Sequence, residues 1–282
     1  MALRWRRRAV RRPDVDLAVL ELGDPGAPTV ILVHGWPDTH RLWLPLAEHL
    51  TRRSGLGLHL VAYDTRGQGA SPTAAPDTAF ALPHLAADLL AVLDAVSPDE
   101  PAHVVGHDWG SVQSWEAVCE PAAEDRMASF TSISGPNLDH VAAWVRDTVR
   151  HPTPRGIAAV LGQAVSSSYV PFLVSPLAPP LLGALGRRDM VSGLRYYRAN
   201  MLHRLDAARE RRTRVPVLQL ALSRDPAIRD DALRASDPWC TDLRRHRLPL
   251  GHWAPRTSPA AVAEQVLALV TSVEGRHSTG RG

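Results

Sequence analysis

Residues 106–110 read Gly-His-Asp-Trp-Gly and place an aspartate between two glycines. A short strand signal precedes this pentapeptide at 103–105 and a helical pattern follows at 111–119, which predicts a tight strand-turn-helix connection with Asp108 at its apex. Glycines suit the flanks because such a turn strains its central residue and brings strand and helix close together. A carboxylate held there is ionised at neutral pH and can attack an sp3 carbon without a base to activate it. The pattern therefore predicts Asp108 as a nucleophile that forms an alkyl ester.

Asp108 has a plainer interpretation as the N-cap of the helix that follows. Aspartate is common at N-caps and contributes about 1 kcal/mol there. A helix N-terminus also favours a negative charge by roughly 0.3 to 1 kcal/mol, which would keep the carboxylate ionised in an apolar site. The two interpretations differ in whether the rest of the chain supplies the base that an ester intermediate requires.

A histidine and an acid that could serve this turn lie late in the chain. Gly-His-Trp at 251–253 directly follows the last predicted strand, and Asp225 lies just after the strand before it. Loops at the carboxyl ends of parallel strands meet at one edge of the sheet, so we expect His252, Asp225 and Asp108 to lie together. Asp230 and Asp231, on the next predicted helix, are weaker candidates for the acid. The order nucleophile, acid, histidine predicts that Asp225 orients His252, which activates water.

Short apolar segments alternate with longer helical patterns, as in a mostly parallel sheet that helices cover on both faces. Eight strands are predicted at 4–10, 17–22, 30–33, 58–63, 103–105, 130–134, 217–221 and 246–250, and the first two are expected to pair antiparallel. Helices are predicted at 42–50, 82–96, 111–119 and 259–273.

The interval between the sixth and seventh strands, about 80 residues, is far longer than an ordinary connection. It contains helical patterns at 141–149, 157–165 and 192–205, and a proline-rich apolar stretch at 171–185. We expect a helical cap over the carboxyl edge of the sheet, where open α/β sheets bind ligands. The predicted division is a core at 1–135 and 214–274, a cap at 136–213 and a flexible tail at 275–282.

The Asp108 turn and the loop His-Gly-Trp-Pro at 34–37 resemble the α/β-hydrolase superfamily, and within it the epoxide hydrolase family. The resemblance covers nearly the whole chain and implies an α/β-hydrolase fold with an eight-stranded sheet and a cap inserted after the sixth strand. It implies that the backbone N–H groups of Trp36 and Trp109 form an oxyanion hole, and that a cis peptide bond precedes Pro37. We expect Trp36, Pro37, Trp109 and Trp253 to line the substrate pocket. The segment 64–71 is expected to be structural, and His107 to point into the core.

Two cap tyrosines complete the resemblance to epoxide hydrolases, in which such residues bind and protonate the epoxide oxygen. Tyr169 opens the sequence Tyr-Val-Pro-Phe-Leu-Val-Ser-Pro, and Tyr197 lies in Arg-Tyr-Tyr-Arg, where Tyr196 is a weaker alternative. Each tyrosine also has a plainer interpretation as a core aromatic.

A closer similarity involves residues 107–119 together with Ser-Ile-Ser-Gly-Pro at 132–136. These segments are similar to the hydrolase half of actinobacterial proteins that fuse an epoxide-hydrolase-like domain to a short-chain dehydrogenase. The sequence has no Gly-X-Gly-X-X-Gly fingerprint, so no NAD chemistry is expected, and the chain is a stand-alone relative or part of a longer protein. The sequence has no metal-ligand spacing either, and we expect no cofactor.

Three functions are compatible with these residues. The first is hydrolysis of an apolar epoxide, a class that includes lipid-like epoxides, to a vicinal diol through an aspartyl ester, with Tyr169 and Tyr197 as acids. The second is haloalkane dehalogenation by the same Asp-His-Asp triad, with the indoles of Trp109 and Trp36 as halide donors. The third is a catalytically silent protein that keeps the fold and binds a ligand.

Charge and cysteine usage limit the partners and the compartment. All 32 basic residues are arginine, and the net charge is +3. Arginines at 4–12 alternate with apolar residues, which favours a solvated edge strand over an arm for nucleic acid or an anionic membrane. Cys119 and Cys240 are too few for a disulfide framework, so a cytoplasmic location is expected. No signal peptide or membrane-spanning segment is predicted, because prolines interrupt the apolar stretch at 171–185. A homodimer is left open.

Overall fold

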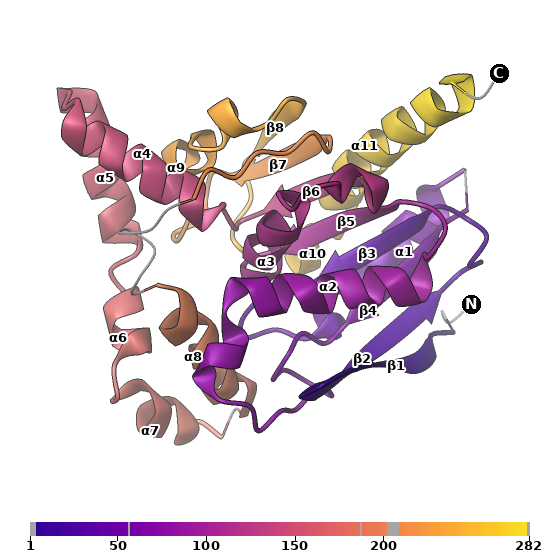
Figure 1. Cartoon of the computed structure of the whole chain (residues 1–282), viewed down its shortest axis with the longest axis horizontal. Coiled ribbons are helices and arrows are strands. Elements are labelled where there is room, and N and C mark those ends of the chain that lie inside the picture. The colour runs from indigo at the N-terminus through magenta and orange to yellow at the C-terminus, as the bar shows by residue number, and fades with distance from the viewer. Residues whose placement is uncertain (1–3, 56, 187, 202–208, 281–282) are drawn as a thin grey trace.

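The computed structural model describes residues 4–55, 57–186, 188–201 and 209–280. An eight-stranded sheet with the order β1-β2-β4-β3-β5-β6-β7-β8 forms its centre (Figure 1). The strands are β1 (Arg6–Arg12), β2 (Val15–Leu22), β3 (Thr29–Val33), β4 (His59–Tyr63), β5 (Ala102–His107), β6 (Met127–Ile133), β7 (Val217–Leu222) and β8 (Leu243–Leu248). β2 pairs antiparallel with β1 and with β4, and the other neighbours pair in parallel. The predicted mostly parallel sheet is confirmed.

Helices cover both faces of this sheet. α2 (Leu82–Val96) and α3 (Trp109–Val118) pack on one face, whereas α1 (Leu44–Arg53) and α11 (Pro259–Gly280) pack on the other. The shorter helices are η1 (His40–Trp43), η2 (Asp77–Phe80), η3 (Ala123–Asp125), α9 (Asp230–Arg234), η4 (Asp237–Trp239) and α10 (Ala254–Thr257). None of the helices in the described part of the chain has the length and apolar character to cross a membrane.

The sequence of β3 shows why its position in the sheet is central. All five residues of Thr29–Val33 are buried. Ile31 and Val33 join the core on the α2 and α3 face, whereas Val30 and Leu32 join the core on the α1 and α11 face. Successive side chains of a strand point to opposite faces, so a strand buried on both sides reads as a continuous apolar run.

The described residues between β6 and β7 form five helices: α4 (Leu138–Arg150), α5 (Pro154–Ser166), α6 (Val170–Val174), α7 (Ala178–Gly183) and α8 (Arg188–Asn200). Asn137 caps α4 by accepting hydrogen bonds from the amides of Asp139 and His140, and Thr153 caps α5 in the same way from Gly156. Figure 1 shows α4 to α7 as a column beside the sheet, with α8 returning toward the core. The predicted helix at 192–205 ends at Asn200, and its positions 202–205 lie outside the described residues.

Several predicted boundaries are wrong. β1 spans Arg6–Arg12 rather than 4–10, and β6 spans Met127–Ile133 rather than 130–134. β8 spans Leu243–Leu248 rather than 246–250, because its register is set by parallel pairing with β7 and its many arginines hide the strand signal. α11 continues to Gly280, although the sequence predicted a tail from residue 275. Gly275 does not end the helix, because an interior glycine costs only about 1 kcal/mol relative to alanine and leaves the backbone hydrogen bonds intact.

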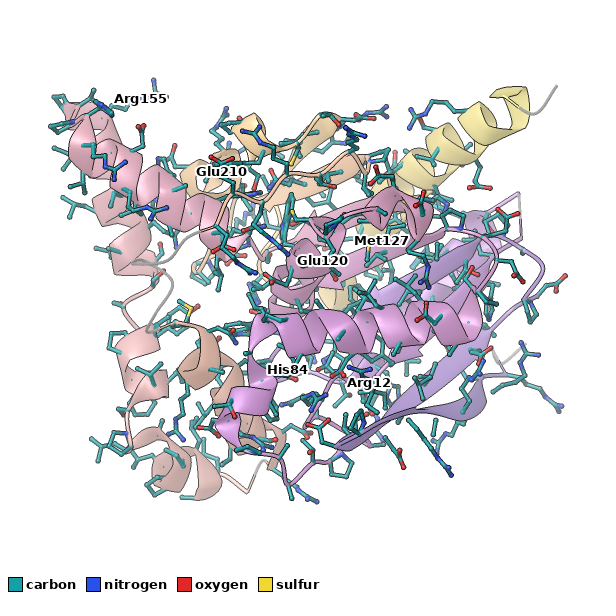
Figure 2. All side chains as sticks on the ribbon, viewed as in Figure 1. Arg12, His84, Glu120, Met127, Arg155 and Glu210 are labelled. Carbon is teal, nitrogen blue, oxygen red and sulfur yellow. The ribbon has the colours of Figure 1, made fainter. Side chains whose placement is uncertain are left out.

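The arginine-rich N-terminal segment forms the outermost strand of the sheet. β1 pairs with β2 alone, and Arg6, Arg7 and Arg8 are exposed while Val10 is buried. Arg12 bonds to the buried carboxylate of Asp88 on α2 (Figure 2). The edge-strand interpretation of this cluster is therefore confirmed, and its charge blunts the open edge against pairing with another chain.

Candidate active site

The connection from β5 to α3 is a sharp turn with Asp108 at its apex. Asp108 has φ of 54° and ψ of −126°, a conformation that non-glycine residues rarely adopt. A side chain at Gly110 would lie 2.0 Å from the carbonyl oxygen of Val33, so only glycine fits where α3 meets β3. Asp108 occupies the N-cap position of α3, but its side chain does not make the capping hydrogen bond of an ordinary N-cap. The plain capping interpretation therefore does not account for this side chain, which the strained turn lifts above the sheet.

The Asp108 carboxylate is held by two backbone amides. Its Oδ1 accepts a hydrogen bond of 2.7 Å from the amide of Trp36, and the amide of Trp109 also bonds to the carboxylate. The peptide bond between Trp36 and Pro37 is cis, as the sequence predicted. Burial raises the pKa of Asp108 to about 6, although nearby His252 and the two amides favour the charged form. The carboxylate is thus largely ionised at neutral pH, but only weakly stabilised by its surroundings.

His252 and Asp225 lie beside this carboxylate. His252 Nδ1 donates to Asp225 Oδ2 over 3.0 Å, and His252 Nε2 lies 3.7 Å from Asp108 Oδ2. Asp225 is fixed in turn, because its Oδ1 accepts a 2.8 Å hydrogen bond from the amide of Ala227. The weaker candidate Asp230 instead pairs with Arg247 on β8. The structure thus brings Asp108, His252 and Asp225 together in the order that the sequence predicted.

Electrostatics within this cluster favour a charged pair. Burial alone would lower the pKa of His252, but the hydrogen bond to Asp225 and the charge of Asp108 outweigh it and raise that pKa. Burial would likewise raise the pKa of Asp225, whereas the hydrogen bond with His252 holds it below its usual value. Asp225 therefore remains a carboxylate and keeps the His252 proton on Nδ1, so that Nε2 faces Asp108.

His107 ties the turn to the histidine loop. Its Nε2 donates to the carbonyl oxygen of His252 over 2.8 Å, and its ring lies 4.8 Å from the His252 ring. His107 is fully buried against Trp43, and burial lowers its pKa to about 3, so it stays neutral. The expected core position is confirmed, but the contact across 145 positions has no local signal in the sequence.

The two cap tyrosines meet above Asp108. Tyr197, on α8, forms a hydrogen bond with Tyr169, and its hydroxyl also bonds to the Trp109 indole. The ring of Tyr197 packs edge-on against Trp36 at 5.5 Å and Trp109 at 4.9 Å. Burial and the charge of Asp108 raise the pKa of Tyr169 to about 12 and that of Tyr197 well above its usual value. Both hydroxyls are therefore protonated donors at neutral pH.

Tyr196 points elsewhere. Its hydroxyl donates to the carbonyl oxygen of Arg66 over 2.6 Å and lies 2.9 Å from Thr65 Oγ1. Adjacent residues on a helix face different directions, so only one of the two α8 tyrosines reaches the cavity. The structure places Tyr197 there, as the sequence preferred.

A cavity of about 110 Å³ lies between α3 and the cap. Asp108, Trp109, Tyr169 and Tyr197 line it. The rest of its wall is mainly apolar and includes Val112, Leu138, Val141, Val170, Met201 and Ile228. The cavity thus combines a mainly apolar wall with a few polar groups, which is the usual composition of a small-molecule site.

Of the four expected pocket residues, only Trp109 lines this cavity, and Trp253, Pro37 and Trp36 do not. Trp253 is 42% exposed, and its indole donates to Asp38 Oδ2 over 3.0 Å. Pro37 borders a separate surface hollow beside His40. The residue after His252 and the residue after Trp36 both turn outward where their loops reverse direction. Trp36 itself packs against Tyr197 at the rim, but its indole donates to the carbonyl oxygen of Met190 over 2.9 Å.

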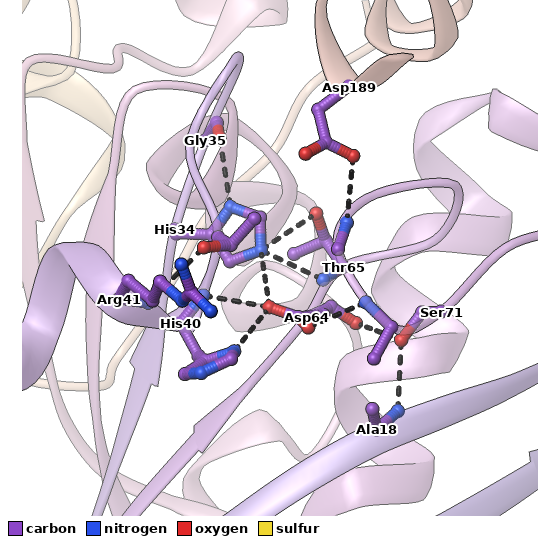
Figure 3. Close-up of polar contacts among 12 residues, drawn as sticks. Ala18, His34, Gly35, His40, Arg41, Asp64, Thr65, Ser71 and Asp189 are labelled. Atoms are coloured by element: carbon purple, nitrogen blue, oxygen red, sulfur yellow. Dashed lines mark hydrogen bonds and ion pairs between the residues drawn. The ribbon is translucent and has the colours of Figure 1, made fainter. Parts of the chain in front are cut away.

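The loop after β4 is hydrogen-bonded to His34 and His40, on the loop that carries Trp36 (Figure 3). Asp64 Oδ1 accepts hydrogen bonds from the amide and the Nδ1 of His40, and Thr65 donates its amide to His34 Nε2. The amide of Gly69 donates to Asp189 at the start of α8, which links this loop to the cap. The contacts agree with the structural role that the sequence predicted for 64–71.

Gln163 and Ser134 are among the cavity residues that the sequence did not predict. Gln163, a buried polar residue of α5, donates to the carbonyl oxygen of Ala227 and accepts from the amide of Arg229, so it joins the cap to the Asp225 loop. Ser134 lines the cavity at the end of β6 with φ of 53°. No local sequence pattern marks either residue as a cavity residue, because contacts with residues distant in the sequence place them there. Among the described residues, no cluster of histidine, cysteine and acidic side chains is arranged to hold a metal ion.

Comparisons with known proteins place the chain in a family. A family model described as the alpha/beta hydrolase fold matches residues 28–259. The chain therefore belongs to the α/β-hydrolase fold family. A Mycobacterium tuberculosis (strain ATCC 25618 / H37Rv) protein named probable oxidoreductase EphD is 35% identical over 300 residues, which cover 95% of this chain and 50% of that protein. The chain thus spans about half the length of this relative.

Further similarities point to proteins named as epoxide hydrolases. Epoxide hydrolase A of M. tuberculosis is 40% identical over 131 residues, which cover 46% of this chain and 39% of that protein. A solved structure of a novel epoxide hydrolase from metagenomes of hot environments has a TM-score of 0.77 at 19% identity, covering 96% of this chain and 99% of that one. Epoxide Hydrolase A of Mycobacterium thermoresistibile has a TM-score of 0.66 at 22% identity, covering 95% and 98%. The structural matches establish the shared fold.

Proposed function

We propose that this chain hydrolyses apolar epoxides to vicinal diols through an ester on Asp108. The observation that carries the proposal is that the carboxylate of Asp108 and the hydroxyls of Tyr169 and Tyr197 border the same small apolar cavity. An epoxide needs both groups at once, because its carbon requires a nucleophile and its oxygen requires an acid. Relatives named as epoxide hydrolases support the proposal.

In the first step, Asp108 Oδ2 attacks a ring carbon, and the carbon–oxygen bond of the epoxide breaks. Oδ2 is the attacking oxygen because Oδ1 is bound to the Trp36 amide. The ring oxygen takes a proton from the tyrosine pair, whose raised pKa values keep both hydroxyls protonated until they are needed. The product is a hydroxyalkyl ester whose carbonyl oxygen is Oδ1.

In the second step, His252 removes a proton from a water molecule that attacks the ester carbon. The 3.7 Å between His252 Nε2 and Asp108 Oδ2 places the base beside the ester without a direct bond. Oδ1 becomes an oxyanion on the amides of Trp36 and Trp109, and each such donor contributes roughly 2.7 to 4 kcal/mol. The bond between the ester carbon and Oδ2 then breaks, and His252 returns its proton to the departing Oδ2, which leaves as a hydroxyl of the diol. Asp108 is left as a carboxylic acid that keeps Oδ1 and the oxygen of the water, and its proton returns to the deprotonated tyrosine.

A single-turnover reaction in heavy-oxygen water tests this route. With enzyme in excess over styrene oxide, we expect the diol to carry no label. The peptide that contains Asp108 should have gained one heavy oxygen atom. Repeated turnover should then carry the label into the diol. Label in the diol on the first turnover would contradict the ester, since water would have attacked the epoxide directly.

The same samples separate the two alternative functions. Dehalogenation needs two halide donors, but the Trp36 indole is bound to Met190 and the Trp109 indole to Tyr197, which argues against a halide site here. Halide release from a bromoalkane without diol formation from epoxides would favour it. A silent binding protein would bind epoxide, form no diol and keep its affinity in Asp108→Ala. Terminal-alkyl and fatty-acid epoxides would then define the preferred size.

A further inference from the structure

The cap concentrates the exposed apolar side chains of the molecule. Of the eleven large hydrophobic residues exposed in the described part of the chain, nine lie between residues 149 and 185. They are Val149, Ile157, Leu161, Val165, Tyr169, Phe172, Leu177, Leu181 and Leu185. A monomeric protein rarely exposes so many large apolar side chains within one segment without using them for binding.

α5 exposes apolar side chains and buries a polar one, the reverse of an ordinary surface helix. Ile157, Leu161 and Val165 recur at four-residue spacing, and Val165 is 74% exposed. The buried residue of the same helix is Gln163, whose amide is bound to the Asp225 loop. A surface helix ordinarily turns polar residues to water and apolar residues to the core. α5 does the reverse, so its outward face is suited to an apolar medium.

The α7 region repeats the pattern. Leu177, Leu181 and Leu185 also recur at four-residue spacing, and each is more than half exposed. With Ile157, Leu161 and Val165 they form what we call the cap surface. Figure 1 shows α5, α6 and α7 following one another along the outer side of the molecule, on the column that stands away from the sheet. The residues of the cap surface are therefore exposed on the outer side of the cap.

Within the chain segment that carries the cap surface, the charged residues have one sign. No aspartate or glutamate occurs between Asp147 and Asp189, and the only charged residues of that interval are four arginines, at 150, 155, 187 and 188. Figure 2 places Arg155 at the outer tip of the column. Self-association through this surface would oppose arginine to arginine, whereas an anionic lipid surface would neutralise the arginines and accept the leucines.

We propose that the cap surface docks onto a bilayer that contains anionic lipid, with α5 and α7 lying in its interface. The cavity opens close to this surface, because Gln163 and Val170 line it from the same two helices that present Leu161 and Phe172 outward. Docking would thus place the cavity beside the layer in which apolar molecules collect. The inference rests on the exposed residues alone and does not require the proposed reaction.

Vesicle flotation with the full chain tests the proposal. One set of vesicles contains about 30% phosphatidylglycerol in phosphatidylcholine, and the other contains phosphatidylcholine alone. We expect the protein to bind the anionic vesicles on the order of tenfold more tightly than the neutral ones, and we expect high salt to weaken this binding. The double variant Leu161→Asp/Val165→Asp should lose about tenfold of this binding. Leu44→Asp, an exposed leucine outside the cap, is the matched control and should bind like the wild type. Thermal melts of both variants report folding.

Three results would overturn the proposal. These are no binding to anionic vesicles, equal binding by the double variant, and a dimer in sedimentation that forms without lipid and that the double variant abolishes. The last result would make the cap surface an interface between two copies. Diol formation from a water-soluble epoxide is measured on the same preparations, so loss of activity with intact vesicle binding would contradict the reaction and leave the docking standing.

Discussion

The two oxygens of Asp108 have different surroundings, and this difference gives each a separate task. Oδ1 is bound to a backbone amide 2.7 Å away, while Oδ2 faces His252 at 3.7 Å without a hydrogen bond. The bound oxygen is already where an oxyanion would form, so little rearrangement is needed between ester formation and hydrolysis. The pKa of about 6 leaves the attacking oxygen charged but poorly solvated, which favours nucleophilic attack.

Replacing His252 should separate the two steps. In His252→Gln we expect ring opening to proceed once and the ester to accumulate, because only hydrolysis needs the base. Steady-state diol formation should fall by roughly 10² to 10⁴-fold, the usual contribution of a general base. Intact-protein mass spectrometry should show one added epoxide mass. The double variant Asp108→Asn/His252→Gln is the control and should show no adduct, and an adduct there would place the nucleophile elsewhere.

At the scale of the element, α8 carries adjacent tyrosines with different tasks. Tyr197 reaches the cavity, whereas the Tyr196 hydroxyl is bound to the loop after β4. α8 is also held to the core by Trp36 and by Gly69, through the carbonyl of Met190 and the side chain of Asp189. The helix therefore presents one hydroxyl to the substrate from a firmly fixed base.

Phenylalanine substitutions should distinguish the two tyrosines of α8. Tyr197→Phe should lower kcat/KM for an epoxide by roughly 10 to 10²-fold, less than the full effect of an acid because Tyr169 remains. Tyr196→Phe should leave kcat/KM within about twofold and lower the free energy of unfolding by about 1 kcal/mol, since it removes a buried hydrogen bond. Steady-state kinetics and urea unfolding check the pair. Equal losses of kcat/KM would show that the tyrosines act only through packing.

The sequence predicted elements well where local pattern and tertiary environment agree. β3 and β4 are apolar runs buried on both faces, and their positions were predicted almost to the residue. β8 was displaced by three residues because arginines dominate its sequence and pairing with β7 sets its bounds. The proximity of Asp108, Asp225 and His252 was predictable because each follows a strand at the same edge of the sheet. The contacts of His107 and Gln163 were not, since partners 145 and 64 positions away select them.

The ionised carboxylate of Asp108 lowers the stability of the whole folded molecule. The ordinary pKa of an aspartate is near 3.8, and burial raises that of Asp108 to about 6. The folded state therefore binds the proton more tightly than the unfolded state, and stability is lost as pH rises from about 4 to about 6. Above that window the ionised carboxylate imposes a constant cost of up to about 3 kcal/mol.

Asp108→Asn should relieve this cost. We expect the variant to be more stable than the wild type by about 1 to 3 kcal/mol at pH 8, and the gain to shrink toward pH 4. Asp225→Asn should do the opposite at pH 8, because the pKa of Asp225 is held below its usual value and its charge stabilises the folded state. Thermal melts between pH 4 and pH 8 check both. A gain for Asp108→Asn that does not vary with pH would point to strain at the turn rather than to charge.

The attachment of α8 has a consequence for how a substrate enters. Asp189, Met190 and Tyr196 anchor this helix to the core, whereas Tyr169, just before α6, is 39% exposed. Tyr169 therefore lies in a more exposed part of the cavity wall than α8 does, and we expect a substrate to enter past the segment of Tyr169. Tyr197 would then keep its position while the substrate enters, whereas Tyr169 would move. Tyr169 would reach its position as the second proton donor only after the substrate has passed.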